Sequence, residues 1–277
     1  MTTKLRTIGS GMDHPEGVAY SDTHGLFCGG EDGQIYAVDM ETGEHREVAN
    51  TGGFVLGLAF GPRGRLFACD MGRAAVLSID VQSGEVEDVT TDRGGALAVP
   101  NHLAFATDGT LYVSDSGTWG KDDGRIVAYG PSGNPPTVIC AGLAFANGLA
   151  LDESSEALYI VESSTPGISR ISLSNNEVGL QSLVIEMPAT VPDGIALCGD
   201  GSLVIACYRP DAIFTWHPSR GLSTLVIDGQ GLTLSAPTNV TFAAARRDRL
   251  IAANLAGHHL TELVDHGLQG TVMGYTT

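Results

Sequence analysis

The stretch PNHLAFATDGTLYVSD, Pro100–Asp115, contains the unit from which the fold can be predicted. It consists of a short apolar run, an Asp-Gly turn and a second apolar run rich in Leu, Tyr and Val. An Asp-Gly pair between two such runs is a signal for a β-hairpin. The same unit recurs along the chain. The other copies begin PEGVAY at Pro15, VLGLAF at Val55, ANGLAL at Ala146, PDGIAL at Pro192 and PTNVTF at Pro237.

The spacing of these copies is regular. At the same point of each copy the chain places Glu16, Leu56, Asn101, Asn147, Asp193 and Asn239, in steps of 40, 45, 46, 46 and 46 residues. This period is typical of one four-stranded propeller blade. No long stretch has a helical period. The sequence therefore predicts an all-β fold, a six-bladed β-propeller of four-stranded antiparallel blades around a central channel.

The repeats predict one domain over residues 1–277. Few residues follow the run Leu260–Val264, so the last blade needs a strand from elsewhere in the chain. We expect the N-terminal segment Lys4–Ile8 to close the ring as the outer strand of the sixth blade. Residues from Thr271 compete for that place.

Composition narrows the class of partner. The formal net charge is −17 and the pI is near 4.6, which disfavours nucleic acid and anionic membranes. The five Cys form no CxxC pair and no zinc spacing, as expected for buried free thiols in a reducing compartment. The N-terminal residues MTTKLRTIGSG lack the apolar stretch of a signal peptide. We therefore expect a cytoplasmic protein that binds a small molecule. The sequence does not indicate the oligomeric state.

The repeated position has a chemical consequence. The first strand of each propeller blade lines the central channel, so equivalent residues form a ring. Five of the six residues carry side-chain oxygen, and Leu56 is the exception. Such a ring needs water or a metal to satisfy it. Carboxylate and amide oxygens suit Ca²⁺, Mg²⁺ or Mn²⁺ better than zinc. A water-filled polar channel and a metal site both remain open at this point.

A second set of residues lies at the end of the second strand of each copy. Its members are Gly30, Asp70, Asp115, Glu162, Cys207 and Asn254. These strands return to the end of the channel where the first ring lies. The acids either cap local backbone N–H groups, which we favour, or contact substrate at the channel mouth.

The motifs PEG, PNHLAF, NGLALD, PDGIAL and PTNVTFA, with LYVSDSG at Leu111 and LYIVES at Leu158, resemble the senescence marker protein/gluconolactonase family of six-bladed propellers. The resemblance runs from Asp13 to the end of the chain. It implies one divalent cation, Ca²⁺ before Mg²⁺, Mn²⁺ or Zn²⁺, bound by Glu16, Asn101, Asn147 and Asp193. It also implies that Asp193 acts as general base or nucleophile.

The chain departs from the family pattern in three places. His102 replaces the Asp that usually follows Asn101. The family's sugar-binding Arg is missing before Asn101, where the chain has only Ala98, Val99 and Pro100, so we expect a less hydroxylated substrate. Ala196 and Thr241 replace the acid and the His that accompany a second, structural calcium in some relatives.

These observations predict a metal-dependent hydrolase that opens a lactone or related ester, with the metal as Lewis acid and Asp193 as general base. The alternatives are a phosphotriester hydrolase using the same site and a non-enzymatic ligand-binding propeller. The candidate substrate-binding residues are Asn239, His102, Asp115, His258 and Trp119, which lies in the loop 116–124. Strand alternation predicts that the His102 side chain points away from the channel axis.

Overall fold

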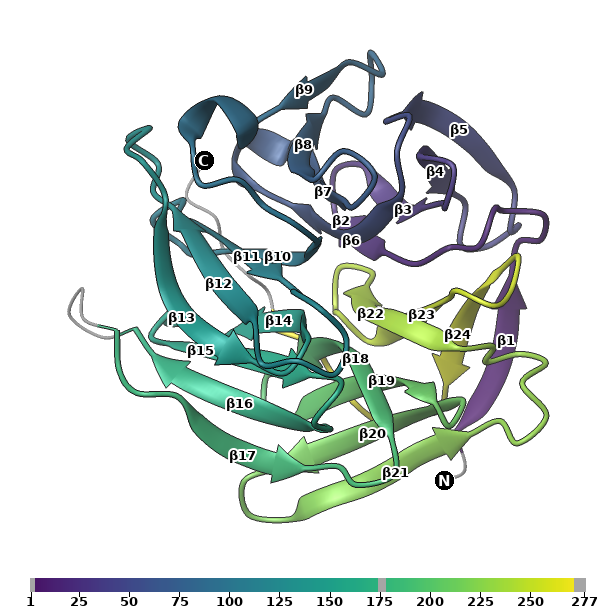
Figure 1. The fold of residues 1–277 in the computed structure, drawn as a ribbon. Helices are drawn as coiled ribbons and strands as arrows, with labels where there is room; N and C mark the ends of the chain where they lie inside the picture. The colour runs from purple at the N-terminus through teal and green to yellow at the C-terminus, as the bar shows by residue number, and fades with distance from the viewer. Residues whose placement is uncertain (1–2, 174–177, 272–277) are drawn as a thin grey trace.

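A computed structural model describes residues 3–173 and 178–271. Six four-stranded antiparallel sheets form a ring, which confirms the predicted six-bladed propeller (Figure 1). Only two short 3-10 turns interrupt the described β-structure, η1 (Pro62–Gly64) and η2 (Thr91–Arg93). Among the described residues, no helix is long and apolar enough to cross a membrane.

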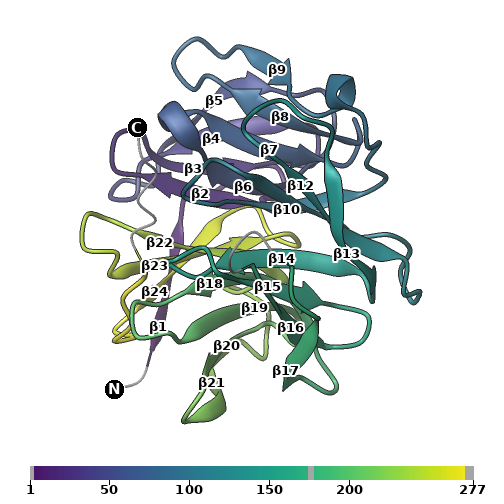
Figure 2. The ribbon, with the colours of Figure 1, turned by 90° about the vertical axis from the view of Figure 1, so that its left-hand side faces the viewer.

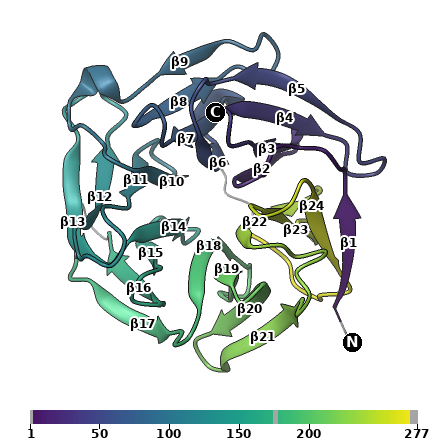
Figure 3. The same ribbon diagram turned by 45° about the vertical axis from the view of Figure 1, so that its right-hand side comes forward.

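Each sheet runs from an inner strand beside the central axis to an outer strand at the rim (Figure 3). The first three blades are β2 (Val18–Ser21), β3 (Gly25–Gly29), β4 (Gln34–Val38) and β5 (His45–Asn50); β6 (Val55–Phe60), β7 (Leu66–Asp70), β8 (Ala75–Ile79) and β9 (Val86–Asp88); and β10 (Pro100–Phe105), β11 (Leu111–Asp115), β12 (Gly124–Tyr129) and β13 (Thr137–Leu143).

The remaining three blades follow the same order. They are β14 (Ala146–Leu151), β15 (Ala157–Glu162), β16 (Gly167–Ser172) and β17 (Ser182–Glu186); β18 (Val191–Leu197), β19 (Leu203–Arg209), β20 (Ala212–His217) and β21 (Gly221–Ile227); and β22 (Pro237–Ala243), β23 (Arg249–Asn254) and β24 (Leu260–Val264), completed by β1 (Lys4–Ile8).

The ring closes as the sequence predicts. β1 pairs antiparallel with β24 from Lys4 opposite Val264 to Ile8 opposite Leu260. In Figures 1 and 2 the purple strand lies beside the yellow one. Arg6 also donates a 2.8 Å hydrogen bond to Glu262 of β24. The competing segment lies elsewhere, because the Thr271 N–H donates to Leu197 O of the fifth blade. Residues 272–277 lie outside the described part of the chain.

The core lies between neighbouring blades, where the faces of adjacent sheets meet. Leu66, Leu77 and Ile79, for example, are fully buried against residues of the first blade. All five cysteines are free thiols, and four of them, Cys28, Cys69, Cys198 and Cys207, are buried as predicted. Each blade buries its faces only against its neighbours, so the closed ring holds the structure together.

Five of the six inner strands begin with a β-bulge, and β2 of the first blade pairs with β3 in continuous register. In the second blade Val55 pairs with Asp70 and Leu58 with Ala68, so Leu56 and Gly57 together face Cys69. The fourth, fifth and sixth blades have the same register shift. A bulge suspends the alternation of side chains and turns the strand. It directs the first residues of these five inner strands toward the channel.

Glycine follows the ring position in four of the six blades, and close approach explains it. A Cβ atom on Gly148 would lie 2.5 Å from the carbonyl oxygen of Asp193 in the next blade. On Gly194 it would lie 2.5 Å from the carbonyl oxygen of Thr238. Neighbouring backbones therefore nearly touch at this level of the channel. No larger residue fits there without moving a blade.

Gly148→Ala is therefore expected to lower the free energy of unfolding by about 1–3 kcal/mol, the usual effect of overpacking. Gly199→Ala is the matched control, since nothing lies within 4 Å of its Cβ position. The control should leave stability unchanged or raise it by up to about 1 kcal/mol. Chemical denaturation measures both, and an equal effect of the two substitutions would refute the close-approach explanation.

Candidate metal centre

Four buried side chains surround the channel axis, one each from the first, third, fourth and fifth blades. They are Glu16, Asn101, Asn147 and Asp193, which are only 3–8% exposed. Each has one buried oxygen without a hydrogen-bond partner: Glu16 Oε2, Asn101 Oδ1, Asn147 Oδ1 and Asp193 Oδ1. Among the described residues only three other buried side-chain polar atoms lack a partner. Buried oxygens without partners are costly, so their concentration here indicates a bound ligand.

The two carboxyl groups have raised pKa values. Burial raises the pKa of Glu16 to about 7. Burial also raises the pKa of Asp193 well above its usual range, and the nearby charge of Glu16 adds to this. Two buried carboxylates that share a site resist ionising together. A divalent cation would stabilise both charged forms, and the two amides would add ligand atoms without charge.

The donor set fits a hard cation. All four oxygens without partners come from carboxylates or amides, the ligand type preferred by Ca²⁺, Mg²⁺ and Mn²⁺. The described residues contain no cluster of three or more His, Cys, Asp or Glu that would hold a metal. The four residues of this site do not form such a cluster, because two of them are asparagines.

Ser163 orients one of the amides. The Asn147 Nδ2 group donates a 3.2 Å hydrogen bond to Ser163 Oγ, which donates a 2.6 Å bond to Pro192 O. This chain of bonds turns Asn147 Oδ1 away from Ser163 and links it to the residue before Asp193. The sequence did not predict a role for Ser163. The only available signal was its place directly after Glu162, which Ser116 shares directly after Asp115.

The acids that end the second strands cap backbone N–H groups, as favoured above. Each accepts a hydrogen bond from the segment that precedes the first strand of its own blade. The pairs are Asp70 with Phe54 N at 3.0 Å, Asp115 with Val99 N at 2.7 Å and Glu162 with Ala144 N at 2.9 Å. Asp115 is also bound by Arg125 at 2.8 Å. Its buried oxygens are all engaged, so its predicted contact with substrate is replaced by a structural role.

Asn239 does not occupy the ring position. Pro237 pairs with Asn254 and Val240 with Ala252, in the same register as Pro192 and Ile195 of the fifth blade. Thr238 is therefore the counterpart of Asp193. The prediction that Asn239 occupies this position in the sixth repeat was wrong by one residue. Thr238 Oγ1 and Asn239 Nδ2 both donate to the backbone carbonyl of Glu16, at 2.8 and 3.2 Å.

His102 points into the channel, contrary to the prediction from alternation. Its Nδ1 accepts a 3.2 Å hydrogen bond from Leu149 N on the neighbouring inner strand. Asn101 is the extra residue of a bulge, so the alternation fails at this point. Burial lowers the pKa of His102 to about 4, although a hydrogen bond with Asn239 opposes the shift. His102 and Asn239 replace glycine in opposite blades.

Two other predicted residues lie in loops at the same end of the channel as the ring. Trp119 follows β11, and its ring centroid lies 5.0 Å from that of Phe145. His258 lies between β23 and β24, with its ring 4.5 Å from that of His14 and its Nδ1 3.0 Å from Met12 O. The mouth thus has an aromatic pair on one side and a histidine pair on another.

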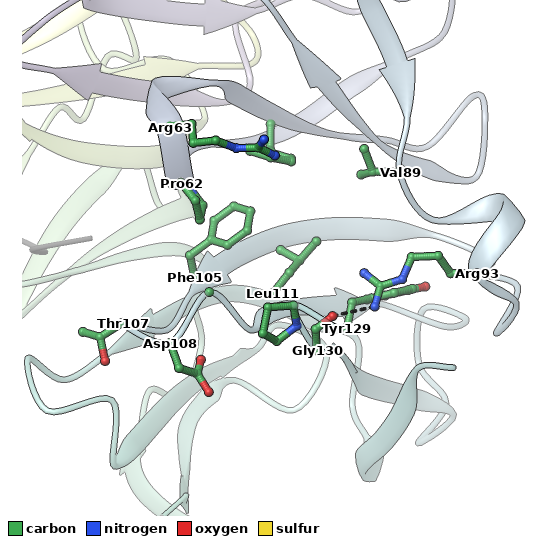
Figure 4. A pocket seen from close by; sticks show the side chains of 13 residues that line it. Pro62, Arg63, Val89, Arg93, Phe105, Thr107, Asp108, Leu111, Tyr129 and Gly130 are labelled. Carbon is green, nitrogen blue, oxygen red and sulfur yellow. Dashed lines mark hydrogen bonds between the residues drawn. The ribbon is translucent and has the colours of Figure 1, made fainter. Parts of the chain in front are cut away.

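Two cavities lie away from the four ring residues. One of about 410 Å³ opens toward the other end of the inner strands and is lined by Tyr20, Phe60 and His102, among others. The second, of about 350 Å³, lies between the second and third blades. Figure 4 shows it beside Phe105 and Tyr129, with the guanidinium of Arg93 bonded to Gly130 O at 2.6 Å.

This geometry defines a class, a six-bladed propeller with a buried all-oxygen site on its axis. The sequence profile of the SMP-30/gluconolactonase/LRE-like region matches residues 14–254. The chain therefore belongs to the SMP-30/gluconolactonase family, as the resemblance of its motifs predicted.

The chain is also similar to individual proteins, at low sequence identity. The chain is 30% identical to strictosidine synthase-like protein 6 of Arabidopsis thaliana over 224 residues, which are 74% of this chain and 59% of that protein. It is 23% identical to lactonase drp35 of Staphylococcus haemolyticus, over 73% of this chain and 66% of that protein. The chain thus spans well under the full length of these relatives.

Solved structures share the fold. A gluconolactonase of Xanthomonas campestris superposes with a TM-score of 0.80 at 21% identity, covering 94% of this chain and 89% of that one. Regucalcin of Agrobacterium tumefaciens, described as a calcium-binding protein, gives 0.77 at 14% identity, covering 97% and 95%. At these identities the likeness establishes the fold.

Ser163→Ala is expected to weaken Ca²⁺ binding by about 10–100-fold, because the Asn147 amide loses the partner that orients it. Isothermal titration calorimetry measures the affinity. Ser164→Ala is the control, since only the backbone N–H of Ser164 forms a described hydrogen bond. Equal affinity of the two variants would show that Ser163 has no part in the site.

Proposed function

We propose that this protein is a divalent-cation-dependent hydrolase that opens a lactone or a related ester, with Ca²⁺ as the favoured cation. One observation carries the proposal: four different blades each contribute, at or just before the start of the inner strand, a buried side-chain oxygen without a hydrogen-bond partner. A propeller that only bound a ligand with its rim would have no need to bury two carboxylates in this way. Membership of the SMP-30/gluconolactonase family agrees with this function.

Glu16, Asn101, Asn147 and Asp193 would hold the cation. When bound, it would supply Lewis acidity, polarising the substrate carbonyl and stabilising the negative charge that develops on its oxygen. The two carboxylates balance its charge. The raised pKa values of the free site imply that binding also releases protons.

Asp193 then serves as the general base. A water molecule attacks the carbonyl carbon, and the Asp193 carboxylate accepts the proton from that water. The ring C–O bond breaks, and the leaving alkoxide takes the proton back from Asp193. Lactone and water give one hydroxy acid, which ionises and releases a proton into solution. A lactone is an activated ester, so a mild carboxylate base suffices.

His102 contributes as a neutral group. Its lowered pKa leaves the imidazole uncharged near neutral pH, so it adds no positive charge beside the cation. Through Leu149 N and Asn239 it ties together inner strands from three blades. His102 and Asn239 thus support the floor of the site.

We expect proton release from a panel of lactones, followed with a pH indicator, to depend on the cation. Chelation should abolish turnover, and one added cation should restore it. Asp193→Asn should lower kcat by at least about 100-fold, because the base is lost while the side-chain shape is kept. Glu44→Gln, on the exposed surface, should leave kcat unchanged.

Three results would contradict the proposal. Turnover that survives both chelation and Asp193→Asn would place the chemistry elsewhere. Turnover of phosphotriesters but of no lactone would show that the same site serves the other reaction. If neither substrate class reacts and no cation binds, the four side chains line a ligand-binding channel.

A further inference from the structure

We propose that Trp119 and Phe145 form an apolar subsite beside the candidate metal centre. This subsite receives an aliphatic or aromatic group carried by the substrate. The inference rests on the proposed lactone or ester hydrolysis and names the substrate class. Trp119 comes from the loop after β11 in the third blade, and Phe145 directly precedes β14 of the fourth.

Trp119 presents exposed apolar surface that a ligand could cover. Its side chain is 55% exposed, and it is the only aromatic residue among the exposed large apolar residues of the described chain. Its ring meets Phe145 edge to face, at an interplanar angle of 68°. Two adjoining aromatic side chains at a channel mouth provide apolar area that a ligand would bury.

The loop of Trp119 is fixed close to two ring residues. The Ser116 N–H donates to Val99 O at 2.9 Å, and Ser116 Oγ donates to Ala146 O at 2.7 Å. Val99 lies two residues before Asn101, and Ala146 directly precedes Asn147. Within the loop, Asp123 accepts the Thr118 N–H at 2.6 Å. These bonds hold the indole between the third and fourth blades.

Phe145 has a strained backbone that keeps it at the mouth. Its φ is 59°, in the left-handed region, which costs a bulky residue about 1–3 kcal/mol. Two hydrogen bonds maintain this conformation, from Phe145 N to Leu143 O at 3.1 Å and from Ser163 N to Phe145 O at 3.2 Å. Ser163 is also the residue that orients Asn147. The aromatic pair and the candidate metal centre thus share one support.

This side of the mouth offers little to a hydroxylated substrate. Leu56 is the apolar member of the ring in the second blade. The segment before Asn101 reads Ala98, Val99 and Pro100, without a polar side chain. Asp115, the acid that ends β11 in that blade, is bound by Arg125 and backbone N–H groups. The apolar part of a substrate would therefore lie over the second to fourth blades.

Steady-state kinetics with δ-nonalactone and glucono-δ-lactone test the inference. Trp119→Ala should lower kcat/KM for δ-nonalactone by about 10–100-fold, mainly through KM, because the apolar contact is lost. Trp119→Phe should restore most of it. Turnover of glucono-δ-lactone should be lower than that of δ-nonalactone in the wild type and should not change in either variant. Trp216→Phe is the matched control, since Trp216 is the other tryptophan and lies in β20.

The outcomes separate this inference from the proposed function. If lactones are hydrolysed but Trp119→Ala affects both substrates equally or neither, the subsite is refuted and the hydrolase remains. If no lactone is hydrolysed, the subsite is tested by binding. The fluorescence emission of Trp119 is measured while each lactone is added to the double variant Trp216→Phe, Asp193→Asn, which has no other tryptophan. A saturable change with δ-nonalactone and none with glucono-δ-lactone supports the subsite. No change with either overturns it.

Discussion

Six inner strands meet around one axis, and the small space between their backbones limits which residues fit at this level of the channel. Glycine follows the ring position in four blades, because a Cβ atom would strike the carbonyl oxygen of the next blade, as at Gly148 and Gly194. The bulge at the same level directs the ring residues inward. Close approach of the backbones thus brings together side chains that lie 46 or more residues apart in the chain.

The site also depends on closure of the ring. Glu16 comes from the first blade and Asp193 from the fifth, and the sixth blade between them is completed by β1. The backbone carbonyl of Glu16 is bound by Thr238 and Asn239 of that blade. Their hydrogen bonds keep Glu16 in place. Two buried carboxyl groups with raised pKa values are a stable arrangement only if a cation or protons balance them.

Repetition made the fold and most of the ring predictable from sequence. The period of about 45 residues predicted the six blades. The oxygen-bearing residues at one position of most copies included the four side chains that each have an oxygen without a partner. Prediction failed where a local bulge overrides alternation: Asn239 was aligned one residue out of register, and His102 was expected to face away from the axis. Ser163 was missed because its role depends on a hydrogen bond to another blade.

Anomalous diffraction from crystals grown with Ca²⁺ would test whether the four side chains bind a cation. We expect one anomalous peak on the channel axis, about 2.3–2.6 Å from Glu16 Oε2, Asn101 Oδ1, Asn147 Oδ1 and Asp193 Oδ1. A channel in which those four oxygens contact only water, with Ca²⁺ absent or bound elsewhere, would contradict it.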